Sequence, residues 1–353
     1  MDKIISDRIN ILKAIAISYV VIGHMDIWNN TLFPPYSFHI GLFFFISGML
    51  FKEKYINNVY EYLKRRIKSL LVPYYLYFAI YGLITYLVFL ISGKWWGYSF
   101  NLKTILFAPF LNGHQLDFMC PLWFVPQLFI TLITFLFLQR SLKDKNTIIK
   151  SWIYIGLCIL STVIAKIYEP HSVLLVMIRT MFSLFFVYLG NLYFSNINKI
   201  NPFSTKIAGF VFTFQMLLWL YAGCKFGSLD YILVWGIFNG NILLPIVTSI
   251  TGIWFCLFLV NLIYDYIKDI KFIKLIGENT YHIMANHLFI MWIITRILMR
   301  IYPAPLGGEG VGMYAFHNLE YHWFLYYLIS VSISVFIGIA IKKLKRIILS
   351  FLY

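Results

Sequence analysis

Long apolar runs recur from one end of this chain to the other, and they constrain its fold more than any other feature. Of its 353 residues, 61% are hydrophobic and only 12% are charged, whereas soluble domains average about 25% charged residues. A helix that crosses a membrane needs about 20 apolar residues. The runs lie at roughly 9–29, 37–51, 69–92, 122–138, 151–167, 173–194, 207–223, 242–265, 279–301 and 323–341. We therefore expect an all-α integral membrane protein, a polytopic helix bundle with about ten transmembrane helices.

The whole chain, residues 1–353, is expected to form one domain, because no block of about 100 residues is polar enough for a separate soluble domain. Segment 229–247 is apolar enough to be a further span. A crossing there would place either the basic loop 266–274 or the basic end of the chain outside. Gly240 and Pro245 also interrupt it, so we predict an outer loop or an interfacial segment.

The basic charge of the chain has a topological explanation. The net charge is +15, from 29 Lys and Arg against 14 Asp and Glu. Most basic residues lie in short segments between alternate apolar runs, such as 52–68 and 139–150, and in 342–346 after the last run. This is the positive-inside distribution of multi-pass membrane proteins. It predicts that both termini are cytoplasmic, and it needs no nucleic acid as a partner.

The cysteines show no CxxC or metal-ligand spacing, so no metal site is expected. Cys120 and Cys224 both fall in segments assigned to the outer side, which leaves a disulfide between them open. The N-terminus lacks the small-residue cleavage site of a secretory signal, so the first span is expected to remain as an uncleaved helix.

The first apolar run carries two ionisable residues within the stretch LKAIAISYVVIGHM. On a helix, the eleven residues from Lys13 to His24 amount to about three turns plus 20°, so the two side chains share one face. Ionisable groups within a span usually face a bundle interior or a watery cavity. Both are therefore functional candidates. Lys13 fits a lysine that extends to the inner interface equally well, and His24 also fits a hydrogen-bonded core histidine.

The second run, FHIGLFFFISGMLF, contains a small step at Ser47 and Gly48 in an otherwise bulky helix. Small residues let two helices approach closely. We expect a close helix contact at this step.

Four more positions could place functional groups within the bundle, three of them toward its outer side. His39 in the second run, Trp123 in PLWFVPQLF and Arg179 in the sixth run are candidates for substrate binding. His287 in IGENTYHIMANHLFIMW lies about two turns into its helix and is a candidate partner for His24. Plainer interpretations stay open: an interfacial histidine, an aromatic-belt tryptophan, and an arginine paired with an unidentified group.

The third run is preceded by a cationic segment, KRRIKSLLVPYY. Arg65, Arg66 and Lys68 lie at the expected cytoplasmic start of a helix, where backbone N–H groups also favour anions. Arginine adds bidentate geometry for phosphate. This segment suits a phosphorylated ligand from the cytosol, and it suits plain topogenic charge equally well.

Taken together and in this order, the segments resemble the acyltransferase-3 family of bacterial membrane O-acyltransferases, especially its fucose 4-O-acetylase-like branch. The family's first helix has a context like DxLRGIAIxxVVxGH, and NILKAIAISYVVIGH places Lys13 and His24 at the positions of its arginine and histidine. FHIGLFFFISGMLF, the basic run ending in Pro73, PLWFVPQLF and IGENTYHIMANH match later family elements. Lysine in place of arginine keeps the charge at position 13 but loses the planar fork.

The resemblance implies transfer of an acyl group, usually acetyl from acetyl-CoA, to a sugar hydroxyl of a cell-surface glycan such as O-antigen or capsule. It implies a multi-pass protein of the bacterial cytoplasmic (inner) membrane, with acetyl-CoA, a lipid-linked or polymeric carbohydrate acceptor and membrane lipid as partners. No permanently bound cofactor is expected.

Roles for individual residues follow from this expected reaction. His24 would be the general base or would briefly carry the acetyl group. Lys13 would stabilise oxyanion charge or the CoA head, and His287 would orient His24 or the acceptor. The CoA phosphates would be held by Arg65, Arg66 and Lys68.

The main alternative is a transporter or flippase of lipid or polysaccharide. About ten spans with buried ionisable groups also describe secondary transporters, many of which contain repeated halves with matching broken helices. We find no such repeat in the sequence.

Overall fold

The computed structural model describes residues 3–25, 33–97, 101–113, 115–196, 205–226, 230–238, 240–302 and 322–351. It is 84% helical, which confirms an all-α fold. The helices are α1 (Lys3–Gly23), α2 (His39–Met49), α3 (Val59–Arg66), α4 (Val72–Ser92), α5 (Leu102–Leu106), α6 (Ala108–Leu111), α7 (Phe124–Ser141), α8 (Thr147–Ile167), α9 (Ser172–Ser195), α10 (Thr205–Phe226), α11 (Leu244–Ile267), α12 (Lys271–Glu278), α13 (Thr280–Leu298) and α14 (His322–Phe351).

Short elements join these helices. The 3-10 turns are η2 (Pro35–Ser37), η3 (Glu53–Asn57), η5 (Asp117–Trp123) and η6 (Leu233–Trp235), and a π-helical turn, η4 (Ile67–Leu71), joins α3 to α4. A two-stranded antiparallel hairpin is formed by β1 (Tyr231–Ile232) and β2 (Ile237–Phe238).

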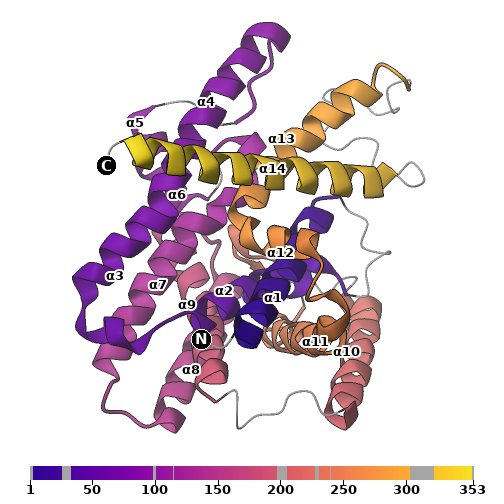
Figure 1. Cartoon of the computed structure of the whole chain (residues 1–353). Coiled ribbons are helices and arrows are strands. Elements are labelled where there is room, and N and C mark those ends of the chain that lie inside the picture. The colour runs from indigo at the N-terminus through magenta and orange to yellow at the C-terminus, as the bar shows by residue number, and fades with distance from the viewer. Residues whose placement is uncertain are drawn as a thin grey trace.

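Six helices are long and apolar enough to cross a membrane: Val59–Ser92, Asp117–Ser141, Thr147–Ile167, Ser172–Ser195, Leu244–Ile267 and His322–Ile347. Two shorter apolar helices, His39–Met49 and Gly209–Tyr221, accompany them. Apolar side chains on their outer faces are exposed, for example Leu83, Leu90 and Ile91 on α4, which projects beyond the other helices in Figure 1. Such exposed apolar surface fits contact with lipid. The count of about ten spans and the cytoplasmic placement of the termini stay predictions.

Besides α10, whose segment Gly209–Tyr221 is one of the shorter apolar helices, the long helices α1 and α13 are not among these six. α1 carries four charged residues, and α13 carries two histidines and an asparagine in its first two turns. Polar groups inside a membrane protein usually mark functional positions. The candidate site described below is built around these two helices.

The bundle is organised around α9 and α1. α2, α7 and α8 pack against α9, whereas α2, α11, α12 and α13 pack against α1. α14 runs crosswise in Figure 1 and packs on α13 and α12. Because α2 contacts both α9 and α1, it connects the two halves of the bundle.

The contact between α2 and α9 is as close as backbone allows. A Cβ added to Gly48 would lie 1.9 Å from the carbonyl oxygen of Val187, and one added to Gly190 would lie 1.9 Å from that of Phe45. Only glycine fits at either position. The close contact predicted from the small step at Ser47 and Gly48 is confirmed.

The end of α1 differs from the prediction. The first span was expected to continue to residue 29 with His24 well inside it, but α1 ends at Gly23 and His24 lies in the following turn. Pro35 of η2 comes within 3.1 Å of where a Gly23 Cβ would be. The chain therefore turns next to η2, which directly precedes α2. Residues 26–32 lie outside the described residues.

Two further segments can be compared with their predictions. The described part of 229–247 forms the hairpin and the start of α11 rather than a further span, as predicted; Gly236 adopts a positive φ of 67° between its strands. The basic segment 342–346 was expected after the last span, but it continues α14 as helix. Cys120 and Cys224 are free, so the disulfide that the sequence left open is not formed.

The α2–α9 contact predicts a large loss of stability in Gly48→Leu. The new side chain would strike backbone rather than a flexible side chain, so we expect the free energy of unfolding to fall by about 3 kcal/mol, the upper end of the usual cost of overpacking. Thermal unfolding of the purified protein in detergent measures this. The matched control is Gly156→Leu on α8, where a Cβ meets no atom within 4 Å. Equal unfolding temperatures for the two variants would contradict the described packing.

Candidate active site

A cavity of about 400 Å³ lies where α1 ends. His24 lines it from the turn after α1, Tyr36 from η2, His39 from the first residue of α2, Trp123 from the end of η5, and Asp230 from the position before β1. The residues come from segments far apart in the sequence. Three of the predicted site residues, His24, His39 and Trp123, therefore share one cavity.

The fourth predicted residue of this region, His287, lies beside His24. The centroids of the two imidazole rings are 5.4 Å apart, with an angle of 44° between their planes. His39 and His287 are both within electrostatic range of His24. The ring of Tyr36 lies between two of these histidines, 6.3 Å from that of His24 and 5.0 Å from that of His39. His24 and His287 thus lie side by side, and the role predicted for His287 as a partner of His24 stays a prediction.

Backbone hydrogen bonds define which nitrogen of two histidines can act as a base. His39 Nδ1 lies 2.5 Å from the Pro35 carbonyl oxygen, and His287 Nδ1 lies 2.7 Å from that of Ile283. A carbonyl oxygen only accepts, so each Nδ1 carries the hydrogen and each neutral ring presents Nε2 as an acceptor. His287 Nε2 is buried and has no hydrogen-bond partner within the described part of the chain. His39 is 4% exposed and His287 is fully buried.

The hairpin forms one wall of the cavity and is firmly attached to the bundle. The hydroxyl groups of Tyr231 and Ser249 are hydrogen-bonded at 2.9 Å, which ties β1 to α11. Thr248 and Ser249 also donate to the Ser37 carbonyl oxygen, at 3.1 and 3.2 Å. These bonds connect the hairpin, α11 and the start of α2.

Arg179 of α9 supports the same wall from outside the cavity. Its guanidinium donates to the carbonyl oxygens of Leu233, Val234 and Asn112 and lies 5.4 Å from the ring centroid of Trp123. It is 1% exposed and does not line the cavity. An uncompensated buried cation would be strongly unfavourable, so the carbonyl groups keep it in place. Its predicted role in substrate binding stays a prediction, and its position favours support of Trp123 and the hairpin.

Asp230 is a cavity residue that the sequence analysis missed. It is 9% exposed, and its Oδ1 is buried without a hydrogen-bond partner in the described regions. Burial raises the pKa of this carboxyl group to about 7. The signal in the sequence was a single acid in the apolar stretch LDYILVW, but nothing there shows that it faces the histidines.

A buried polar network between α4 and α13 was also missed. The Tyr81 hydroxyl donates to Asn286 Oδ1 at 2.9 Å, and Asn286 Nδ2 donates to the Tyr77 hydroxyl at 3.1 Å. Tyr77 in turn lies 2.8 Å from His282 Nδ1. The network runs along α13 from His282 to the residue next to His287. It fixes α13 against α4 by hydrogen bonds rather than by apolar packing alone.

Lys13 is not part of the cavity. It is half-buried, and the charged groups within its range are Glu278 and Lys342. Lys342 Nζ donates to the Glu278 carbonyl oxygen at 3.0 Å. Ile17, on the face of α1 between Lys13 and His24, is fully buried. Lys13 and His24 therefore lie in two separate environments along one helix.

The predicted phosphate-binding residues are on the surface around α3 and η4. Arg65 is exposed and donates to the Tyr55 hydroxyl at 2.7 Å, and Arg66 lies 4.8 Å from the ring centroid of Tyr62. Lys68 is exposed in the π-helical turn. These residues do not line the histidine cavity, and their role stays a prediction.

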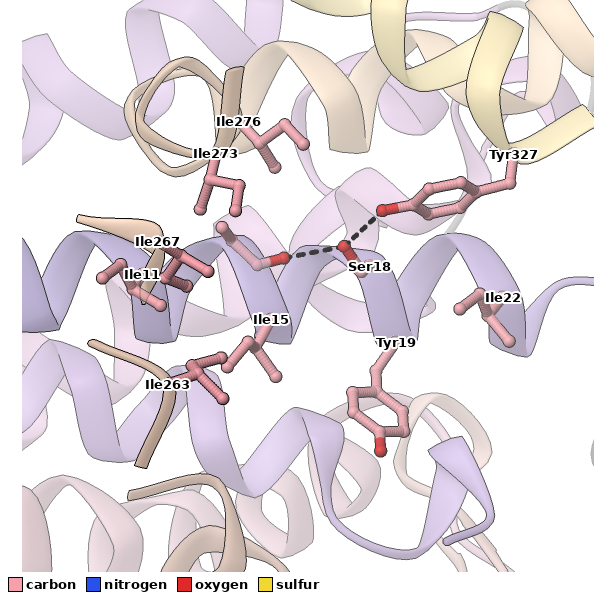
Figure 2. Close-up of a pocket in the computed structure, with 11 residues that line it drawn as sticks. Ile11, Ile15, Ser18, Tyr19, Ile22, Ile263, Ile267, Ile273, Ile276 and Tyr327 are labelled. Atoms are coloured by element: carbon pink, nitrogen blue, oxygen red, sulfur yellow. Dashed lines mark hydrogen bonds between the residues drawn. The ribbon is translucent and has the colours of Figure 1, made fainter. Parts of the chain in front are cut away.

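A second cavity, of about 430 Å³, lies along another face of α1. Figure 2 shows it surrounded by isoleucines of α1, α11 and α12. The hydroxyl groups of Ser18 and Tyr327 form a hydrogen bond beside it, with 2.7 Å between the two oxygens. No histidine, carboxylate or cation of the described chain lines it. It has no group suited to acid–base catalysis at neutral pH, so the histidine cavity is the candidate active site.

These features define the class of protein and then its family. Six long apolar helices around buried ionisable groups describe a multi-pass membrane protein. A family model described as an acyltransferase domain matches residues 6–343, so the chain belongs to the acyltransferase-3 family. Comparisons with curated proteins and with solved structures found no match.

The position of Arg179 predicts that its loss loosens the cavity wall. Arg179→Met removes hydrogen bonds from a charged donor to two loops, so we expect the free energy of unfolding to fall by about 3 kcal/mol. Cys120, which lines the cavity, should be alkylated faster. Arg179→Lys should restore little, because an ammonium group lacks the planar fork.

Unfolding in detergent and peptide mass spectrometry of alkylated Cys120 are the measurements. Arg140→Met, which removes an exposed arginine at the end of α7, is the matched control. Unchanged alkylation in Arg179→Met would show that Arg179 does not support the wall.

Proposed function

We propose that this protein is a membrane O-acetyltransferase that moves an acetyl group from acetyl-CoA to a sugar hydroxyl of a cell-surface glycan. The observation that carries the proposal is the cavity that His24 and His39 both line, together with His287, whose ring centroid lies 5.4 Å from that of His24. Membership of an acyltransferase family supports the reaction class. The fucose 4-O-acetylase-like resemblance and the bacterial cytoplasmic membrane belong to the same proposal.

The proposed reaction is a single acyl transfer with His24 as general base. His24 accepts the proton of the acceptor hydroxyl while that oxygen attacks the thioester carbonyl carbon. The tetrahedral intermediate then collapses, the C–S bond breaks, and the leaving thiolate takes the proton back from His24. The products are an acetyl ester and free CoA. His287 is proposed to orient His24 or the acceptor, since its Nδ1 is anchored on the backbone of α13 and its ring lies beside that of His24.

The donor is proposed to approach from the start of α13. The Tyr281 hydroxyl donates to the Leu70 carbonyl oxygen of η4 at 3.2 Å, which places the π-helical turn and Lys68 beside this end of α13. Lys13 and its neighbour Lys342 lie by Glu278, immediately before α13. From Thr280 to His287 the helix rises about 10 Å. Cations near one end of α13 and histidines farther along it suit a ligand with a phosphorylated head and a reactive thioester end.

The acceptor is proposed to occupy the histidine cavity itself. Tyr36, Trp123 and Trp235 supply aromatic surface there, beside the polar groups of His24 and His39. Apolar walls with a few convergent polar groups are typical of small-molecule sites. A volume of about 400 Å³ is large enough for one or two sugar rings.

The proposal predicts that His24→Ala abolishes most of the activity. Loss of a general base lowers the rate by roughly 10²- to 10⁴-fold, whereas unfolding should change little because His24 follows the end of α1. Acetyl transfer by the purified protein, followed as CoA release, measures this. His171→Ala, at an exposed histidine before α9, should keep wild-type activity.

The kinetic pattern distinguishes the two roles proposed for His24. Ping-pong kinetics would assign an acetyl-histidine intermediate, and sequential kinetics would assign a general base. Wild-type rates in His24→Ala would exclude both roles.

The proposed donor site predicts a separate effect of the basic residues. Arg65→Glu combined with Arg66→Glu should raise the KM for acetyl-CoA about tenfold or more, because each change replaces an attraction for phosphate by a repulsion. The control is Arg140→Glu, which also reverses an exposed charge. If KM rises equally in the control, or in neither variant, the basic segment serves topology and does not bind the donor.

A further inference from the structure

The carboxylate of Asp230 has no role in the reaction proposed above, yet it lies in the same cavity. Its Oδ1 is buried without a hydrogen-bond partner among the described residues. Leaving such a group unpaired costs roughly 1–3 kcal/mol, and more when it is charged. Buried polar groups without partners are rare in folded proteins and call for an explanation. A ligand that donates a hydrogen bond would supply one.

Partners among the described residues do not account for this oxygen. Asp230 takes part in neither of the surface ion pairs His171–Glu169 and Lys268–Asp265. The described residues also contain no cluster of His, Cys, Asp and Glu that could hold a metal ion. Because Asp230 lines the cavity, a ligand that enters the cavity comes next to this carboxylate.

The backbone around Asp230 holds the carboxylate in a defined position. The next residue, Tyr231, pairs with Phe238 in the hairpin and is hydrogen-bonded to Ser249 of α11. Arg179 binds the carbonyl groups of Leu233 and Val234, a few residues farther along. A binding group held by packed, hydrogen-bonded elements needs little reorganisation when its ligand arrives.

The neighbours of Asp230 indicate the chemistry of that ligand. Tyr36, Trp123 and Trp235 offer ring surface, whereas His24 and His39 contribute imidazole groups to the cavity lining. No Lys or Arg of the described chain lines it, so an anionic group is disfavoured there. A carboxylate accepts hydrogen bonds at both oxygens. A neutral ring with several hydroxyl groups could donate a hydrogen bond to this carboxylate and also pack against the aromatic surface.

We propose that Asp230 binds the acceptor, by accepting a hydrogen bond from a hydroxyl next to the one that is acylated. This interaction orients the reacting hydroxyl toward His24 and selects acceptors that carry a second hydroxyl in the matching position. The proposal rests on the proposed function and adds the residue that recognises the acceptor.

The test compares Asp230→Asn and Asp230→Ala with wild type in two reactions. The first is acetyl transfer from acetyl-CoA to the base-deacetylated surface polysaccharide of the source cells. The second is release of CoA from acetyl-CoA in the absence of any glycan. The matched control is Asp144→Asn, which makes the same chemical change at an exposed carboxylate between α7 and α8.

We expect the KM for the polysaccharide to rise at least tenfold in Asp230→Asn and further in Asp230→Ala, with glycan-independent CoA release within twofold of wild type. Asp144→Asn should match wild type in both reactions. An unchanged KM in both Asp230 variants would overturn the proposal. An equal loss of both reactions in both variants, at unchanged unfolding temperature, would overturn it as well, because it would place Asp230 on the donor side.

Failure of the Asp230 proposal is distinguishable from failure of the proposed function. If wild-type protein transfers no acetyl group to the polysaccharide and releases no CoA, the O-acetyltransferase assignment fails, and the Asp230 proposal fails with it. If wild type is active and the Asp230 variants are indistinguishable from it, only the role of Asp230 is wrong.

Discussion

The close approach of α2 to α9 joins the two halves of the bundle. At Gly48 and Gly190 each backbone occupies the space that a side chain of the other helix would need. α9 carries Arg179, and α2 begins with His39. The crossing therefore sets the distance between the group that supports the cavity wall and one of the histidines inside it. The hairpin is connected to the start of α2 separately, by hydrogen bonds through α11.

Away from water, every polar group must find its partner inside the protein. The structure meets this requirement in different ways at different polar groups. Arg179 is surrounded by backbone carbonyl groups, and Asn286 joins two tyrosines of α4. The ring nitrogens Nδ1 of His39 and His287 bond to carbonyl oxygens one helical turn earlier. Several buried polar atoms of the described residues have no hydrogen-bond partner, and two of them, His287 Nε2 and Asp230 Oδ1, belong to residues beside or within one cavity. These two are the ones that lie close to the candidate catalytic group, His24.

Much of this site could be predicted because ionisable residues stand out against an apolar background. His24, His39 and His287 were recognisable for that reason, and Gly48 by its small size in a bulky run. The structure separated Lys13 from His24, because the face between them is filled by packed side chains such as Ile17. Helical periodicity gives the direction of a side chain but not what packs against it. Tyr77 and Asn286 were missed because their hydrogen-bond partners lie in distant segments, and Asp230 was missed because the histidines that share its cavity lie in distant segments.

The apolar runs were enough to predict a helical membrane protein, because runs of this length are typical of lipid-spanning helices and backbone groups in lipid are satisfied within helices. The residues available for chemistry could also be listed from the sequence, but which of them meet could not. His24 and His287 lie far apart in the chain, and Asp230 directly precedes a hairpin between two helices. Their convergence depends on how helices cross, and crossing is set by the shapes of many side chains together rather than by any local pattern.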